Sequence, residues 1–124
     1  MIIGIGCDVV DHATTKELGW ISNPSRLQRI FSLPELELLQ THRRDRFIAG
    51  RYAAKEAVLK CLGTGMKDGF ALTNVQVLQA SSGRPIIKID GEVEEAARQL
   101  GIISWHISIS HTPHSSTAFV IAEG

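Results

Sequence analysis

The chain has 124 residues, of which 44% are hydrophobic, and its 13 basic residues balance 13 acidic ones. This length predicts a single domain over residues 1–124, because domains commonly hold about 100–150 residues. The hydrophobic share excludes a disordered tail. The formal net charge of zero argues against a general nucleic-acid binder, which normally carries a strong basic excess.

The sequence also argues against secretion and against insertion into a membrane. No apolar run approaches the roughly 20 residues needed to cross a bilayer. Residues 1–11 show neither the basic start nor the small-residue cleavage site of a signal peptide. We therefore expect a cytoplasmic protein with no membrane partner, in which Cys7 and Cys61 are reduced residues of the core.

Residues 2–10 alternate in a way that predicts a first strand. One face of this strand carries apolar side chains, namely Ile3, Ile5, Cys7 and Val9. The other face carries Gly4, Gly6 and Asp8, and the two glycines would let another element approach the backbone closely. Asp8 interrupts an apolar run, and two readings of it stay open: a strand-end hydrogen-bond acceptor or a metal ligand.

Turn signals divide residues 13–45 into short helices. Pro24 can open a helix that continues through Arg29. Ser32 reads as the cap of a further helix, whose first turn is acidic at Glu35. We therefore expect this region to contribute helices rather than strands.

The clearest helix spans residues 45–62 and is followed by Gly63 as a C′ glycine. One side of it is apolar and consists of Phe47, Ile48, Val58, Leu59 and Leu62. The opposite side consists of the small residues Gly50, Ala53, Ala54, Ala57 and Cys61. Such a helix is expected to be mostly buried, with another element packed closely against its small side.

Charged residues interrupt the apolar side of this helix at Arg51 and Lys55, with Glu56 at its edge. Burying such charges without partners costs several kcal/mol, so they need partners or a ligand. In one reading Glu56 pairs with Lys60 one turn on, and the basic side chains reach water. In the other, Glu56 and Asp8 together hold a hard divalent cation, since magnesium is typically bound by one or two carboxylates, waters and phosphates.

The second half of the chain mixes strands with one helix. Strands are predicted at 73–79, 85–89, 104–110 and 117–123, and a helix at 91–100. The turn at 81–84 joins the first two strands, Gly101 stops the helix, and the last two strands are expected to form a hairpin. This mixture predicts the α+β class.

The triplet Gly63-Thr64-Gly65 directly follows the long helix. It is not a phosphate-binding Walker loop, because GxxxxGK[ST] is absent, and a bare triplet of this kind is mostly a helix stop. With Lys55, Lys60 and Lys67 nearby, it could still supply backbone and ammonium donors to a phosphate-rich ligand.

Three histidines near the end, His106, His111 and His114, raise the alternative of a zinc site. Strand alternation sends His106 and His111 to opposite faces. No cysteine or carboxylate joins them locally, so zinc is the least favoured of these readings.

Four blocks of the sequence resemble the holo-acyl-carrier-protein synthases, in the family's order and across nearly the whole chain. The opening GIGCDVV (4–10) resembles the family's GIGxDIV start. The stretch FIAGRYAAKEA (47–57), which leads to GTG (63–65), resembles the central FLAGRFAAKEA and GTG of these enzymes. GRP (83–85) matches their G-x-P turn, and ISISH (107–111) matches their closing SISH. The central block is the long and specific one.

The resemblance implies a fold, a metal and a set of site residues. The fold would be that of the 4′-phosphopantetheinyl transferases, an antiparallel sheet packed against a long buried helix, in a homotrimer with active sites at subunit interfaces. Asp8 and Glu56 would bind magnesium, and Lys60 would contact phosphate, so these three are the expected catalytic residues. Coenzyme A would lie near Arg51, Lys55, Gly65, Pro85, Ser110 and His111.

The reaction implied by the resemblance moves 4′-phosphopantetheine from coenzyme A to a serine of apo acyl carrier protein, in support of fatty acid biosynthesis. The serine hydroxyl would attack the β-phosphate and adenosine 3′,5′-bisphosphate would leave, while magnesium and Lys60 neutralise the growing charge. The residues do not identify the base that takes the serine proton. The alternative is a binding module that keeps the fold and holds coenzyme A or a carrier protein without catalysis, although buried charges at Asp8 and Glu56 argue against it.

The region expected to dock the carrier departs from the family. Relatives usually carry a basic residue soon after the first strand, on a helix that contacts the acidic carrier, whereas residues 11–17 here are less basic. Lys16, Arg26 and Arg29 could compensate, with apolar contacts expected from exposed Leu27 and Ile30.

Overall fold

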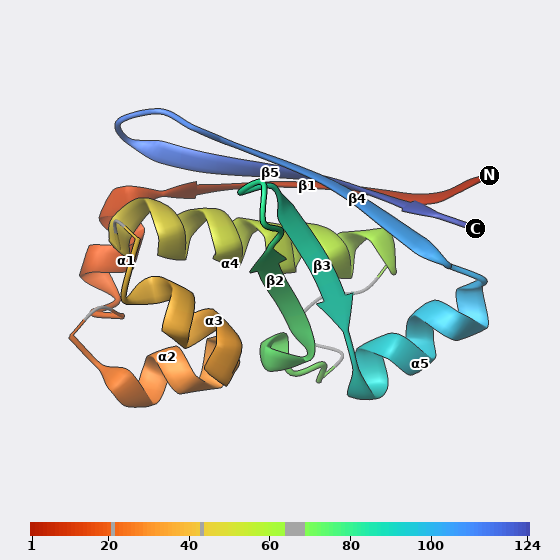
Figure 1. The fold of residues 1–124 in the computed structure, drawn as a ribbon, viewed down its shortest axis with the longest axis horizontal. Coiled ribbons are helices and arrows are strands. Elements are labelled where there is room, and N and C mark those ends of the chain that lie inside the picture. Colours follow the sequence, from red (N-terminus) through yellow and green to blue (C-terminus); the bar gives the residue numbers. More distant parts are fainter. Residues whose placement is uncertain (21, 43, 64–68) are drawn as a thin grey trace.

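The computed structural model describes residues 1–20, 22–42, 44–63 and 69–124 (Figure 1). The chain runs in the order β1 (Ile2–Asp11), α1 (His12–Glu17), α2 (Pro24–Ile30), α3 (Leu33–Leu39), α4 (Arg44–Cys61), a 3₁₀ turn (Leu72–Asn74), β2 (Val75–Gln79), β3 (Pro85–Ile89), α5 (Gly91–Leu100), β4 (Ser104–His111) and β5 (Ser115–Glu123). These elements confirm the predicted α+β class and the closing hairpin. The strand expected to start at residue 73 starts at Val75, because Leu72–Asn74 form the 3₁₀ turn.

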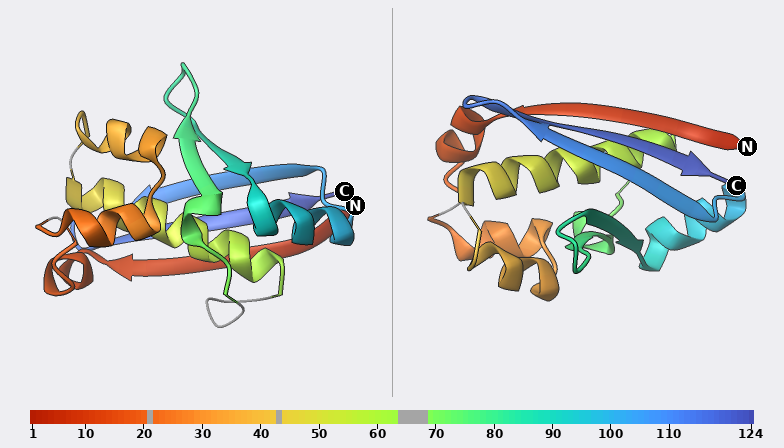
Figure 2. Two further views of the ribbon diagram at one scale, coloured as in Figure 1. Left: turned by 90° about the horizontal axis from the view of Figure 1, so that it is seen from below. Right: turned by 45° about the horizontal axis from the view of Figure 1, so that its top comes forward.

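The strands form two separate antiparallel sheets. The larger has the order β1-β5-β4, so its central strand is β5, and the smaller consists of β2 and β3. Helix α4 lies along one face of the larger sheet, with α1–α3 at one end of it and α5 at the other (Figures 1 and 2). The arrangement is the predicted antiparallel sheet packed against a long buried helix.

Contact between β1 and α4 is backbone against backbone. A Cβ atom added at Gly6 would overlap the carbonyl oxygen of Ala57, and one added at Gly4 would overlap that of Cys61. The expectation that these glycines admit a close neighbour is therefore confirmed, and the neighbour is the small side of α4. Asp8 lies two residues beyond Gly6 on the same alternating face of β1, which brings it to this helix.

The apolar side of α4 is also buried. Phe47 and Ile48 belong to a cluster with Trp20, Leu27, Phe31 and Leu39 from the α1–α3 region. Val58, Leu59 and Leu62 pack in a second cluster that includes Val75, Val77 and Val93. Leu27 is only 7% exposed, so the expectation that it is available for carrier contacts is wrong. The apolar face of α2 packs into the core.

The outer face of the larger sheet, away from α4, is open and partly apolar. Ile5 is 56% exposed, Val9 62% and Phe119 43%. The sequence alternation of β1 therefore separates two faces as predicted, but the glycine face is the one that packs inside. Among the residues that the structure describes, no helix has the length and apolar character needed to span a bilayer.

Candidate functional site

A pocket of about 500 Å³ lies where β1 and α4 meet. Its lining consists of Asp8, Val9, Val10, Asp11, Thr14, Tyr52 and Glu56. Asp8 comes from the helix-facing side of β1, and Glu56 precedes Ala57, the residue that touches the β1 backbone. Two carboxylates from segments far apart in sequence are thus brought to one pocket, as expected from the sequence.

Lys60 completes a charged cluster at this pocket. Its ammonium group donates to Oδ1 of Asp8 at 3.1 Å and to the carbonyl oxygen of Cys7 at 2.8 Å. The ion pair between Glu56 and Lys60, one of the two readings of this helix, is not formed in the described residues, where Lys60 pairs with Asp8 instead. The Lys60 side chain remains 51% exposed, so it can still reach a ligand in the pocket.

Glu56 is short of positive charge. Tyr52 hydrogen-bonds to its carboxylate, but Oε1 is buried without a hydrogen-bond partner among the described residues. Burial raises the pKa of Glu56, nearby Asp8 raises it further, and Tyr52 and Lys60 oppose them. Burial and the two carboxylates also raise the pKa of Tyr52 to about 12. The unpartnered oxygen and the mutual repulsion fit a hard cation such as magnesium.

No group of three or more His, Cys, Asp or Glu side chains suited to a metal occurs in the described part of the chain. A pair of carboxylates is nevertheless the usual protein share of a magnesium site, because waters and substrate phosphates supply the other ligands. The zinc reading loses support, since His106 bonds to Glu123 at 2.9 Å while His111 bonds to Ser116 on the other face.

A second pocket, of about 330 Å³, lies beside the start of α4. Its lining consists of His12, Lys16, Asp45, Arg46, His111, Thr112 and Pro113. Burial lowers the pKa of His111, and the charges of Arg46, His12 and Arg51 lower it further. The excess of basic groups favours an anionic ligand.

Arg51 lies close to this second pocket. Its guanidinium stacks over the Phe47 ring at 4.3 Å from the ring centre, and its Nε is buried without a hydrogen-bond partner in the described residues. Burial lowers the pKa of Arg51, and Glu35 opposes that effect. Arg51 and His111 are thus near each other, as the expected nucleotide contacts would require.

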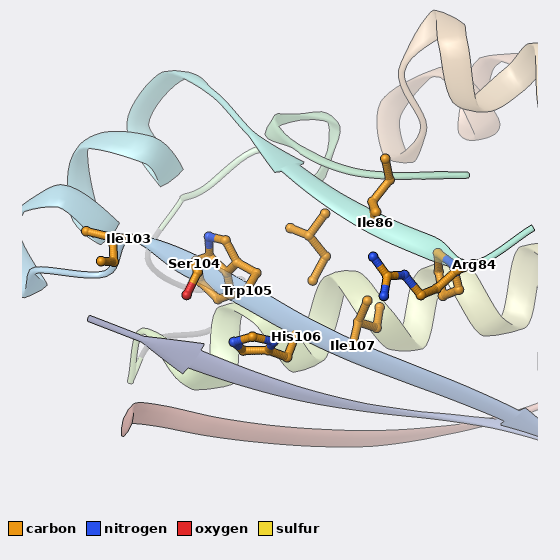
Figure 3. Close-up of a pocket in the computed structure, with 9 residues that line it drawn as sticks. Arg84, Ile86, Ile103, Ser104, Trp105, His106 and Ile107 are labelled. Atoms are coloured by element: carbon orange, nitrogen blue, oxygen red, sulfur yellow. The ribbon is translucent and has the colours of Figure 1, made fainter. Parts of the chain in front are cut away.

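A third pocket, of about 380 Å³, lies between β3 and β4 and contains Pro85 (Figure 3). The Arg84 guanidinium extends from the start of β3 toward β4, near Ile107, and Trp105 and His106 line the same hollow. This pocket shares no lining residue with the one that holds Asp8. Within one chain, Pro85 is therefore not part of the carboxylate site.

Lys55 lies away from all of these pockets. Its side chain and that of Glu35 are both 0% exposed, and the ammonium donates to Glu35 Oε1 at 2.7 Å. It also donates to the carbonyl oxygens of Leu72 and Val75. Burial lowers the pKa of Lys55, and Glu35 opposes that effect. The charge has a partner, as its burial demanded, but the partner is structural rather than a ligand.

The remaining expected nucleotide residues are placed separately. Ser110 is exposed on the opposite face of β4 from His111, and it pairs with Thr117 of β5. Gly65 and Lys67 lie outside the described residues. The structure thus gathers Asp8, Glu56 and Lys60 in one cluster, places His111 beside Arg51, and leaves Pro85 and Ser110 elsewhere.

Sequence reasoning missed Tyr52, His12 and Arg46 as pocket residues. Tyr52 precedes Glu56 by four residues on α4, a spacing that places two side chains together on one helix face, so its contact with that carboxylate could have been inferred. His12 and Arg46 meet only because α1 folds back toward the start of α4, and no local pattern predicts that.

The known proteins that resemble this chain in sequence and in structure belong to one family. Residues 4–121 match the 4′-phosphopantetheinyl transferase superfamily. A holo-[acyl-carrier-protein] synthase of Hydrogenovibrio crunogenus is 43% identical over 99% of this chain and 98% of its own, and that of Hamiltonella defensa is 40% identical with the same coverage.

Solved structures agree with the sequence matches. The crystal structure of holo-[acyl-carrier-protein] synthase from Neisseria meningitidis superposes with a TM-score of 0.90 over 100% of both chains, at 28% identity. The Helicobacter pylori enzyme in complex with coenzyme A gives 0.83 over 96% of this chain and 99% of that one, at 26% identity. With its sheet, its central helix and its paired carboxylates, this chain belongs to the 4′-phosphopantetheinyl transferase superfamily.

Proposed function

We propose that the chain is a holo-acyl-carrier-protein synthase, which transfers 4′-phosphopantetheine from coenzyme A to a serine of apo acyl carrier protein in a magnesium-dependent reaction. The observation that best supports this proposal is the cluster of Asp8, Glu56 and Lys60 at one pocket. Within the described residues, one carboxylate oxygen of Glu56 in this cluster has no hydrogen-bond partner. The relatives that carry this activity by name match the chain over nearly its whole length. Residues 1–124 would form one transferase domain.

Asp8 and Glu56 would hold the magnesium ion, and Tyr52 would orient Glu56 through its hydrogen bond. The ion supplies charge neutralisation for the pyrophosphate oxygens. Lys60, fixed by Asp8 and the Cys7 carbonyl, would place a second positive charge beside the reacting phosphate. The bond from the serine oxygen to the β-phosphorus forms as the bond to adenosine 3′,5′-bisphosphate breaks, and the serine proton departs to an acceptor that these contacts do not identify.

The nucleotide end of coenzyme A would contact Arg51 and His111, whose pocket is rich in basic groups. Pro85, Ser110 and Gly65 stay in the proposal as further contacts. Lys55 is left out of it, because its ammonium is buried and already bonded to three acceptors. A ligand could reach it only after the core had opened.

A homotrimer would bring these separate surfaces together. Ile5, Val9 and Phe119 form an exposed apolar strip on the outer face of the larger sheet, and such strips favour association between protein chains. Pro85 and the carboxylates lie in different pockets of one chain, so a site built between subunits would allow one coenzyme A molecule to use both. The trimer would also bury surface that a chain of this size cannot cover alone.

The carrier protein would dock near α1 and α2. Lys16, Arg26 and Arg29 are exposed there and can meet an acidic partner. Apolar contacts would come from Leu18 and Leu33, which are 41% and 75% exposed, rather than from buried Leu27. A carrier of fatty acid biosynthesis is the proposed substrate, and the cytoplasm is the proposed compartment, since both cysteines are free thiols.

Mass spectrometry of an apo acyl carrier protein, incubated with the chain, coenzyme A and magnesium, tests the proposal. We expect the carrier to gain the mass of one phosphopantetheine, and the gain to vanish with a chelator. Asp8→Ala and Glu56→Ala should abolish the gain while remaining folded, and Glu92→Ala, an exposed acidic change on α5, should leave it intact. Coenzyme A binding without transfer to any of several carriers would favour the non-catalytic binding module instead.

A further inference from the structure

Two histidines that line the basic pocket meet at one buried serine. His12 Nε2 lies 2.8 Å from Ser116 Oγ, and His111 Nδ1 lies 2.6 Å from the same oxygen. Ser116 is 1% exposed and His12 is 9% exposed, whereas His111 is only partly buried. A continuous series of hydrogen bonds thus leads from the largely buried His12 ring on α1, through Ser116 of β5, to the more open His111 ring, and both rings line the pocket.

The number of available protons restricts the hydrogen bonds among His12, Ser116 and His111 to two arrangements. A serine hydroxyl has one proton to donate and can accept from other donors. The oxygen could also accept from both rings, but the Ser116 proton would then lack an acceptor, because Ser116 Oγ has no other hydrogen-bond partner in the described residues. That proton therefore goes to one ring nitrogen, which must be bare, and the other nitrogen must carry a proton of its own. The states of His12 Nε2 and His111 Nδ1 are therefore opposite and coupled through Ser116.

The two arrangements present different groups to the pocket. If Ser116 donates to His111 Nδ1, neutral His111 must carry its proton on Nε2 and so offers an N–H donor. In the reverse arrangement, neutral His111 offers a bare Nε2, which repels anions. The groups that face His111 are Arg46 and Arg51 from α4 and His12 from α1, and together with burial they hold the pKa of His111 below its ordinary value. A neutral ring needs a fixed tautomer to act as a donor.

We propose that His12 is a positioning residue, which donates from Nε2 to Ser116 so that Ser116 donates to Nδ1 of His111, and His111 then presents an Nε2–H donor to a phosphate oxygen of the ligand. The phosphate being that of coenzyme A rests on the proposed function, while the coupling within the protein does not. The basic pocket selects this direction, because Lys16 and Arg46 beside His111 recruit an anion that requires donors.

Histidine ¹⁵N NMR tests the coupling without any activity. In the complex with adenosine 3′,5′-bisphosphate we expect wild-type His111 to show a protonated Nε2 and a bare Nδ1, and His12 to show a protonated Nε2. Ser116→Ala and His12→Phe should each remove this preference and give His111 a mixture of tautomers. An unchanged His111 tautomer in both variants would overturn the proposal, whatever their stability.

Affinity for coenzyme A provides a second, independent arm. Each single variant should raise the Kd about three- to tenfold, the range of one net hydrogen bond. The double variant His12→Phe/Ser116→Ala should be no weaker than the worse single variant, and His12→Gln, which keeps an N–H donor, should bind within about twofold of wild type. Additive losses would overturn the coupling.

His114→Ala serves as the matched control, because His114 is an exposed histidine outside the hydrogen-bonded chain, and it should change neither readout. If the tautomers respond as expected but His111 resonances do not move on addition of coenzyme A, the coupling stands. The proposed nucleotide role of His111 is then what fails.

Discussion

The buried ion pair between Lys55 and Glu35 permits a quantitative test of whether Lys55 serves the fold or the ligand. Lys55→Met keeps the length and volume of the side chain and removes its charge. The change leaves Glu35 without its charge partner at a site with 0% exposure and frees the carbonyl oxygens of Leu72 and Val75. Removing one partner of such a pair typically costs about 3–5 kcal/mol of unfolding free energy.

Two remaining hydrogen bonds to Glu35 limit this loss of unfolding free energy. Glu35 still accepts from the backbone amides of Ser32 and Val77, so its carboxylate is not wholly unpartnered. For a chain of this size the change corresponds to a Tm lower by roughly 10–20 °C. The double variant Glu35→Gln/Lys55→Met, which removes both charges, should lose less than Lys55→Met alone.

Denaturant unfolding and coenzyme A titration, performed on the same samples, make the measurement. Lys55→Met should lose stability but bind coenzyme A as wild type does at a temperature where it is folded. Lys88→Met, a change at an exposed lysine of β3, should leave stability within about 0.5 kcal/mol. Full stability together with a large loss of coenzyme A affinity would refute the structural role and restore Lys55 to the ligand site.

Three further predictions concern the carboxylate site and the carrier surface. Gly6→Ala should cost about 3 kcal/mol or more, because its Cβ would overlap the Ala57 carbonyl and force β1 away from α4; a Tm close to wild type would contradict that packing. Burial and Asp8 raise the pKa of Glu56 above its ordinary value of 4.5, so its contribution to stability is present below pH 4.5 and is lost as the pH rises through the folded pKa. In chelator, Glu56→Gln should therefore gain Tm relative to wild type as the pH rises from 4.5 to neutrality, and a pH-independent difference would count against the shift. Reversing the charges of Arg26 and Arg29 to Glu should raise the KM for the carrier about tenfold and spare coenzyme A affinity, whereas an effect on coenzyme A alone would place the docking surface elsewhere.

Local patterns predicted much of this fold and the centre of its site. The glycines of β1 and the small side of α4 each indicated a closely packed neighbour. The structure shows that they pack on each other, and that contact brings Asp8 to Glu56. Alternation separated the faces of β1, but it could not say which face packs inside. The apolar face looks outward because only the glycine face admits the helix backbone.

Long-range pairings were beyond sequence reasoning. Glu35 reads locally as the acidic member of a helix cap, and it does accept from Ser32. Its second role, as the partner of Lys55, depends on how α3 packs on α4 and β2, which no spacing along the chain reveals. Leu27 was misjudged for the same reason, since the surrounding helices decide whether an apolar side chain is covered.

The order of the larger sheet governs when the protein can fold. β5 is the middle strand, and β1 pairs with no other strand of the described ranges, so that Ile5 meets Ile121 from the far end of the chain. Contacts of such large sequence separation make folding slow, because the long loop must close before they form. During synthesis the hydrogen-bonding edge of β1 must therefore stay unpaired until β5 has left the ribosome. The unpaired backbone edge of β1 is then exposed longest in the nascent chain, which makes this strand the expected site for chaperone binding.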